Sequence, residues 1–165
     1  MPDLKPLSRE TLSRALEKAE RYRLLKEPEQ AASICEDVLL IEPENQKALV
    51  TLLLALTEQL AGVVRSMAAA RHLLPRLTGE YEQAYYAGII CERRARAVLA
   101  KAGPGSGFVA YDFLQKALEW YGKAEALRPA GNDDALLRWN TCVRVLESNS
   151  ELEPAPEERT EISLE

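Results

Sequence analysis

Apolar residues recur every three or four positions along most of the chain, which is the period of an amphipathic α-helix. Near the start this pattern predicts two helices, over about residues 8–25 and 28–41. Ser8 suits the N-cap of the first helix. Pro28 suits the first turn of the second, because the N–H that proline lacks would be unpaired there. Pro43 is expected to end this second helix, so the two helices and their short turn form one hairpin.

The same period predicts five further helices. Their expected extents are a helix capped by Asn45, one over about residues 62–76, one that Thr78 caps and that runs towards Ala102, one over about 108–127 and one over about 133–147. Residues 103–107 contain three glycines and one proline, so they are the expected turn between the two longest helices. The last helix is expected to pack through Leu136, Trp139, Asn140 and Val143 and to close the stack.

The first predicted hairpin carries small, aromatic and proline residues at a particular spacing. They are Ala15, Ala19, Tyr22, Ala31, Val38 and Pro43. This pattern resembles the tetratricopeptide repeat (TPR), a helix–turn–helix unit of about 34 residues in which small residues let the two backbones approach closely. Pro129 follows Ala117 by the same offset by which Pro43 follows Ala31, which is the best internal sign of repetition.

The resemblance covers about residues 12–146 and implies an all-α fold. The implied architecture is a right-handed α-solenoid of about three TPR-like helical hairpins plus a C-terminal capping helix, because a single repeat cannot bury its own apolar face. The expected organisation is a flexible arm over 1–7, the repeat domain over 8–147 and an acidic tail over 148–165. The tail is expected to be disordered, because glutamate and proline dominate it.

Composition and charge narrow the possible partners. The formal net charge of -5 argues against a nucleic-acid binder, which needs a clustered basic face. The first residues lack the apolar core of a signal peptide, and no apolar run approaches the ~20 residues that span a bilayer. We therefore expect a cytoplasmic protein with no membrane partner. Three cysteines without a CxxC spacing indicate neither a disulfide framework nor a zinc site.

Catalytic and cofactor motifs are hard to assemble from these residues. His72 is the only histidine, so any nucleophile–base pair would depend on it. The glycine-rich residues 103–107 are followed by Phe108 where a phosphate-binding loop needs lysine. The prediction is a protein that is not an enzyme and has no cofactor and no metal site.

The resemblance implies a concave groove lined mainly by the first helix of each hairpin. The implied peptide-binding residues are Val50, Thr51, Leu54, Tyr85, Tyr86, Ile89, Arg93, Leu137, Arg138, Thr141 and Arg144. Tyrosine and arginine are enriched at binding hot spots, so the expected function is a non-catalytic protein- or peptide-binding scaffold. Its ligand would carry an apolar anchor and acidic groups.

Two alternatives accompany this prediction, and one role is not expected. Tyr85 and Tyr86 could each pack between helices instead of facing a ligand. The groove could also serve self-association, which would make the chain an assembly subunit and a possible homodimer. Glu17 and Glu20 would repel the carboxylate tail that some TPR proteins clamp, so a chaperone co-factor role is not expected.

Overall fold

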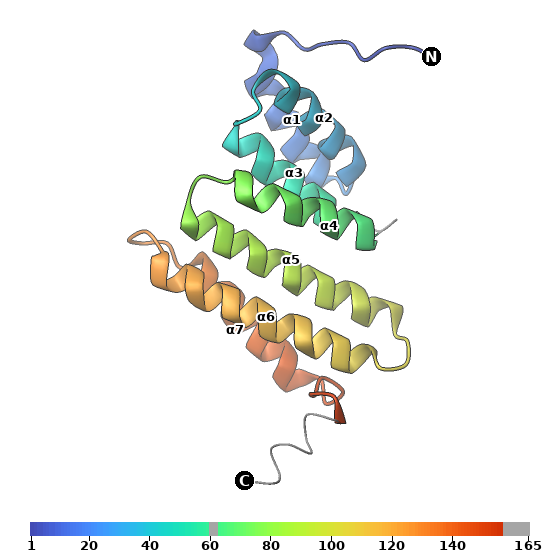
Figure 1. Cartoon of the computed structure of the whole chain (residues 1–165), viewed down its shortest axis with the longest axis vertical. Helices are drawn as coiled ribbons and strands as arrows, with labels where there is room; N and C mark the ends of the chain where they lie inside the picture. Colours follow the sequence, from blue (N-terminus) through green and yellow to red (C-terminus); the bar gives the residue numbers. More distant parts are fainter. Residues whose placement is uncertain (60–62, 157–165) are drawn as a thin grey trace. The chain divides into compact units, whose positions relative to one another are not determined.

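The structure is a computed structural model that describes residues 1–59 and 63–156 (Figure 1). In these residues the chain forms seven α-helices, two short 3₁₀ helices and no strand, so the all-α prediction is confirmed. The helices are η1 (Arg9–Thr11), α1 (Leu12–Leu24), α2 (Pro28–Ile41), α3 (Gln46–Glu58), α4 (Val63–Leu73), η2 (Leu74–Arg76), α5 (Glu80–Lys101), α6 (Ser106–Leu127) and α7 (Asp134–Ser148). They fall into two compact units, Met1–Thr78 and Gly79–Glu165.

A membrane-spanning segment would have to be a long apolar helix, and the described ranges contain no helix that meets both requirements.

In the first unit α1 packs on α2, α2 on α3, and α3 on α4. Small residues lie where α1 and α2 meet: Ala19 and Ala31 are both fully buried. Pro28 begins α2 as predicted, and the helix covers the predicted range. Ser8 does not cap α1, because η1 comes between them and the Ser8 side chain makes no capping hydrogen bond.

Asn45 begins α3 as predicted, and its side-chain oxygen accepts a hydrogen bond from the Ala48 N–H at 2.9 Å. The helix predicted over 62–76 is α4 followed by η2, and Gly62 lies outside the described residues. The prediction for Thr78 is wrong. Its backbone N–H donates to the Gln46 side chain at 3.0 Å, and Gly79 takes the N-cap position of α5.

In the second unit two long helices, α5 and α6, lie side by side, and α7 packs on α6 (Figure 1). The turn between α5 and α6 is shorter than predicted, because α6 already begins at Ser106. Ala102 and Gly105 have positive φ angles of 44° and 73°, and these left-handed residues reverse the chain.

The packed face of α7 differs from the prediction. Ala135 and Cys142 are fully buried, whereas Trp139 is 36% exposed. The packed face is therefore centred about one residue before the expected one. Arg138 lies between Ala135 and Cys142 on the same face and pairs at 3.3 Å with the buried Glu92 carboxylate on α5, a contact that a pattern of apolar residues does not indicate.

The residues after α7 also differ from the prediction. Leu152 is only 7% exposed, so the chain beyond Ser148 packs on the second unit at least this far. A Cβ atom on Gly107 would collide with the Glu151 carbonyl oxygen, which shows how closely this segment crosses the start of α6. Residues 157–165 of the predicted tail lie outside the described residues.

Candidate functional site

The candidate site is a small pocket between α5 and α7 in the second unit. Its walls are Tyr85 from α5 and Asp134, Leu137, Arg138 and Thr141 from α7, and its volume is about 220 Å³. Tyr85 and Arg138 come from helices that are separated in sequence by the whole of α6. Of these five described lining residues, four belong to the set that the TPR resemblance implied, so the fold brings these four together.

Arg138 is held in the pocket wall by a buried carboxylate. Its Nη1 atom lies 3.3 Å and 3.5 Å from the two carboxylate oxygens of Glu92, which is 1% exposed. The Arg138 side chain itself is 33% exposed, so the guanidinium reaches from the core to the surface. Burial has the largest single effect on the pKa of Arg138 and lowers it, but the Glu92 carboxylate, the hydrogen bond with Tyr85 and the nearby tyrosines together outweigh burial, so the pKa is raised. Arg138 therefore keeps its charge and a defined orientation.

Glu92 is shared among three helices. It accepts a hydrogen bond from the Tyr121 hydroxyl on α6 at 2.6 Å and one from Arg96 on α5 at 2.7 Å, besides its contacts with Arg138. Two guanidinium groups thus meet one carboxylate, so the cluster holds more positive than negative charge. Burial, and then the Glu92 charge, raise the pKa of Tyr121, which keeps its hydroxyl protonated and donating.

Tyrosine rings support the other wall of the pocket. Tyr85 stacks on Tyr81 with ring centroids 5.7 Å apart, and meets Tyr86 edge-on at 5.1 Å and Tyr121 at 6.0 Å. The pKa of Arg138 also reflects a hydrogen bond with Tyr85. Burial raises the pKa of Tyr86 to about 12. Both tyrosines are half-buried, and Tyr85 is the one that lines the pocket.

The remaining predicted groove residues have different environments. Thr51 and Ile89 are 3% and 2% exposed, so a partner cannot reach them, and placing them in the groove was wrong. Thr51 lies on α3, which packs on both α2 and α4, so residues beside its main apolar stripe are buried as well. The first unit contains Val50 and Leu54, which are both half-buried. The second unit contains Arg93, which is half-buried, and Arg144, which is exposed.

Sequence reasoning missed Glu92 and Asp134. Glu92 interrupts the apolar stripe of α5, following Ala84 and Gly88 at the same four-residue spacing. A carboxylate at such a position is a signal of a buried ion pair, because an unpaired buried charge is costly. Asp134 gave no such signal, since an acidic residue in the first turn of a helix is ordinary.

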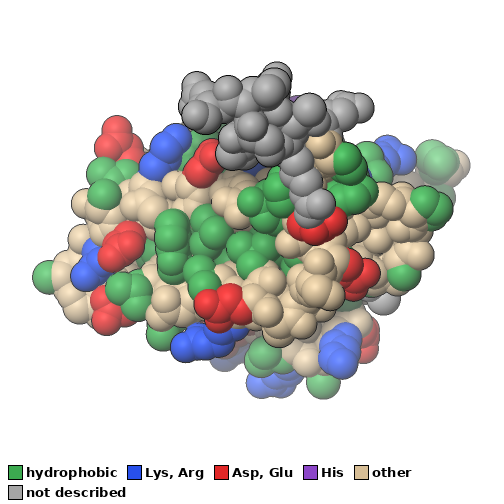
Figure 2. Space-filling model, turned by 90° about the horizontal axis from the view of Figure 1, so that it is seen from below, with side chains coloured by type: hydrophobic (Ala, Val, Ile, Leu, Met, Phe, Trp, Pro, Cys, Tyr) green, Lys and Arg blue, Asp and Glu red, His purple; other side chains and the backbone are tan. Residues whose placement is uncertain are grey.

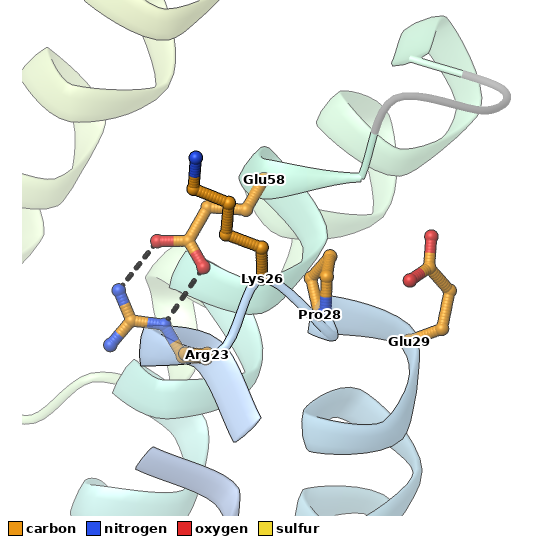
Figure 3. Close-up of a pocket in the computed structure, with 5 residues that line it drawn as sticks. All are labelled: Arg23, Lys26, Pro28, Glu29 and Glu58. Carbon is orange, nitrogen blue, oxygen red and sulfur yellow. Dashed lines mark hydrogen bonds and ion pairs between the residues drawn. The ribbon is translucent and has the colours of Figure 1, made fainter. Parts of the chain in front are cut away.

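The first unit contains a larger pocket that was not predicted (Figure 3). Its volume is about 460 Å³, and its lining includes Arg23, Lys26, Pro28, Glu29 and Glu58. Arg23 forms two hydrogen bonds with the Glu58 carboxylate, at 2.6 Å and 3.0 Å. This forked ion pair joins the end of α1 to the end of α3, and the pocket wall also carries the charged side chains of Lys26 and Glu29.

Among the described residues, no three histidine, cysteine or acidic side chains come together in a way that could hold a metal ion. His72 is exposed on α4. Comparison with protein families, curated proteins and solved structures finds no match to the chain. The resemblance to the TPR therefore stays a prediction that depends on the residue pattern.

Proposed function

We propose that the chain is a non-catalytic module that binds a peptide segment of another protein at the pocket between α5 and α7. The observation that supports this most directly is the convergence of Tyr85, Leu137, Arg138 and Thr141 on one pocket. Leu137, Arg138 and Thr141 are neighbours on α7, so the informative part of this convergence is that Tyr85 of α5 joins them in one pocket.

The size and lining of the pocket suit one side chain of a peptide. Small-molecule sites are usually ~300–1,000 Å³, whereas this pocket measures about 220 Å³. Leu137 offers an apolar surface that is 61% exposed, and Tyr85 and Arg138 are of the types enriched at binding hot spots. The rest of the peptide would lie on the surrounding surface of α5 and α7.

We further propose that the helices form a TPR-like stack: a right-handed α-solenoid of about three hairpins, with α7 as the capping helix. Support comes from the close approach of helices within each unit. Ala19 and Ala31 are fully buried in the first unit, as is Ala117 in the second. Gly88 on α5 lies directly against the ring of Tyr121 on α6.

Selection from a displayed library of random 12-residue peptides would test the binding function. Peptides selected on the full chain should lose at least about tenfold in affinity on the Leu137→Asp variant. Replacing Leu40 by aspartate is the matched control, because Leu40 is an exposed leucine (70%) on α2 and lies far along the chain from the pocket. Equal loss in both variants, or no enriched peptide, would contradict the proposal.

A further inference from the structure

The outer side of α6 carries apolar residues that stay at least partly exposed in the described part of the chain, although Arg94 of α5 lies 5.8 Å from the centroid of one of their rings, that of Phe113. Val109, Trp120 and Leu127 are 46%, 37% and 47% exposed, and the half-buried Phe113 lies between the first two. Their spacings of four, seven and seven residues place them on one face, which is ~27 Å long at 1.5 Å per residue. Figure 2 shows one face of the molecule, on which hydrophobic side chains gather with acidic and basic side chains around them. We call the four residues on α6 the α6 stripe.

Four charged residues run along the edge of the α6 stripe in alternating order. Asp112, Lys116, Glu119 and Lys123 are all exposed. The Lys116 ammonium lies 5.5 Å from the centroid of the Phe113 ring, and the Lys123 ammonium lies 4.4 Å from that of Trp120. The two lysines therefore lean over the stripe, with an acidic residue on the preceding turn of each.

We propose that the α6 stripe pairs antiparallel with the α6 stripe of a second copy, around a two-fold axis beside residue 118. The α6 helix of the second copy runs in the opposite direction, so its charged residues are met in the reverse order. Lys116 then faces Glu119 of the second copy, and Lys123 faces Asp112 of the second copy. Val109 meets Leu127 of the second copy at each end, and the two Trp120 rings lie close to the axis.

Charge complementarity identifies the occupant as a second copy. A two-fold interface uses the same surface twice, so that surface must be complementary to itself. The alternating charges along the edge of the α6 stripe meet that condition, because each of these four α6 side chains faces one of opposite charge in the second copy. A membrane surface fits less well: anionic lipid attracts uninterrupted basic clusters, and here Asp112 and Glu119 interrupt the lysines.

This interface is distinct from the pocket between α5 and α7, and the inference does not depend on the proposed peptide binding. It also differs from self-association through the predicted groove, since none of the groove residues belongs to the α6 stripe. Both surfaces could be used together, so that a dimer would present two pockets.

Sedimentation equilibrium of the full chain over a range of concentrations would test the inference. A species of twice the 18.4 kDa chain mass is expected, and Trp120→Glu should raise the dimer dissociation constant at least about tenfold. The Leu137→Asp variant, altered on α7, should stay dimeric. Lys116→Glu alone should weaken the dimer, and adding Glu119→Lys to it should restore the dimer, because the cross-copy pair is then reversed intact.

Circular dichroism would show whether each variant is folded. The Lys116 and Glu119 exchanges affect exposed side chains only, so they test the interface even if Trp120→Glu does not fold. Three results would overturn the inference: a monomer at every concentration, a dimer that Trp120→Glu or Lys116→Glu leaves unchanged, or a dimer that Leu137→Asp dissociates.

Discussion

The hydroxyl of Tyr121 donates a 2.6 Å hydrogen bond to the carboxylate of Glu92, and neither side chain has appreciable contact with water. Glu92 lies in the packed face of α5, and Tyr121 lies in the packed face of α6. This bond joins the two long helices and fixes the carboxylate on which Arg138 is placed. A charge in the core of the second unit thus determines the shape of a surface pocket.

Replacing Tyr121 by phenylalanine should destabilise the chain without a large change of volume. A hydrogen bond to a charged group is worth about 1.5–3 kcal/mol, and the variant leaves Glu92 with its two arginine partners. The free energy of unfolding, from urea denaturation, should fall by an amount in that range. Tyr111→Phe, a half-buried tyrosine on the same helix, is the control and should change it by less. Equal losses of unfolding free energy in the two variants would show that the Tyr121–Glu92 hydrogen bond contributes no more to stability than the Tyr111 hydroxyl.

Gly88 should not tolerate a side chain, because a Cβ atom there would lie 2.5 Å from Cε1 of the buried Tyr121 ring. Gly88→Ala should therefore lower the free energy of unfolding by about 1–3 kcal/mol through overpacking. Gly122→Ala is the matched control within a helix: its Cβ would lie 3.4 Å from Trp139, an ordinary contact. Because alanine favours helix over glycine by up to about 1 kcal/mol, that control should be neutral or stabilising. Thermal unfolding of both variants would decide the matter.

The Arg23–Glu58 ion pair should contribute more to stability than the other ion pairs of the first unit. Both side chains are about three-quarters buried, with exposed fractions of 21% and 26%, and the arginine binds with two nitrogens. A double-mutant cycle to alanine should give a coupling energy of about 1 kcal/mol. The Lys47–Glu20 pair, at 3.6 Å and about half exposed, should give a coupling close to zero. A larger coupling for this second pair would contradict the ranking.

The buried thiols should make the fold less stable at alkaline pH. Burial raises the pKa of Cys35 and of Cys142 from 9.0 to about 12. Because the folded state then holds these protons more tightly than the unfolded state, their contribution is complete below pH 9 and is lost as pH rises from 9 towards 12. The stability advantage of the native chain over Cys142→Ala should narrow across this window in urea titrations.

Thiol labelling offers a second measurement on the same residues. Cys35 and Cys142 are fully buried, whereas Cys91 is half-buried. At pH 8 a thiol reagent should modify Cys91 first, and the other two only when the chain unfolds. Rapid modification of all three in the folded protein would contradict the burial that underlies the alkaline prediction.

Local signals in the sequence were sufficient for the helices. Pro28 and Asn45 act through their own backbone and side-chain chemistry, so the starts of α2 and α3 were predicted correctly. The apolar period likewise predicted the length of α5. Thr78 was misassigned because its preferred partner, Gln46, is 32 residues away and no local pattern indicates it. Leu152 was missed because it stands between two glutamates, without an apolar residue three or four positions before or after it on a predicted helix.

The candidate site, too, was predicted in part from the sequence and decided in part by the tertiary structure. The sequence by itself determined the packed face of α5, and hence that Tyr85 lies beside it, whereas it placed the packed face of α7 about one residue too far along the chain. Only the tertiary structure decided that Tyr85 shares a pocket with Leu137, Arg138 and Thr141, and that Thr51 and Ile89 are inaccessible. The physical reason is that helix periodicity depends on neighbours three or four residues apart. The rotation of each helix depends instead on partners from distant parts of the chain, such as Glu92 and Arg138.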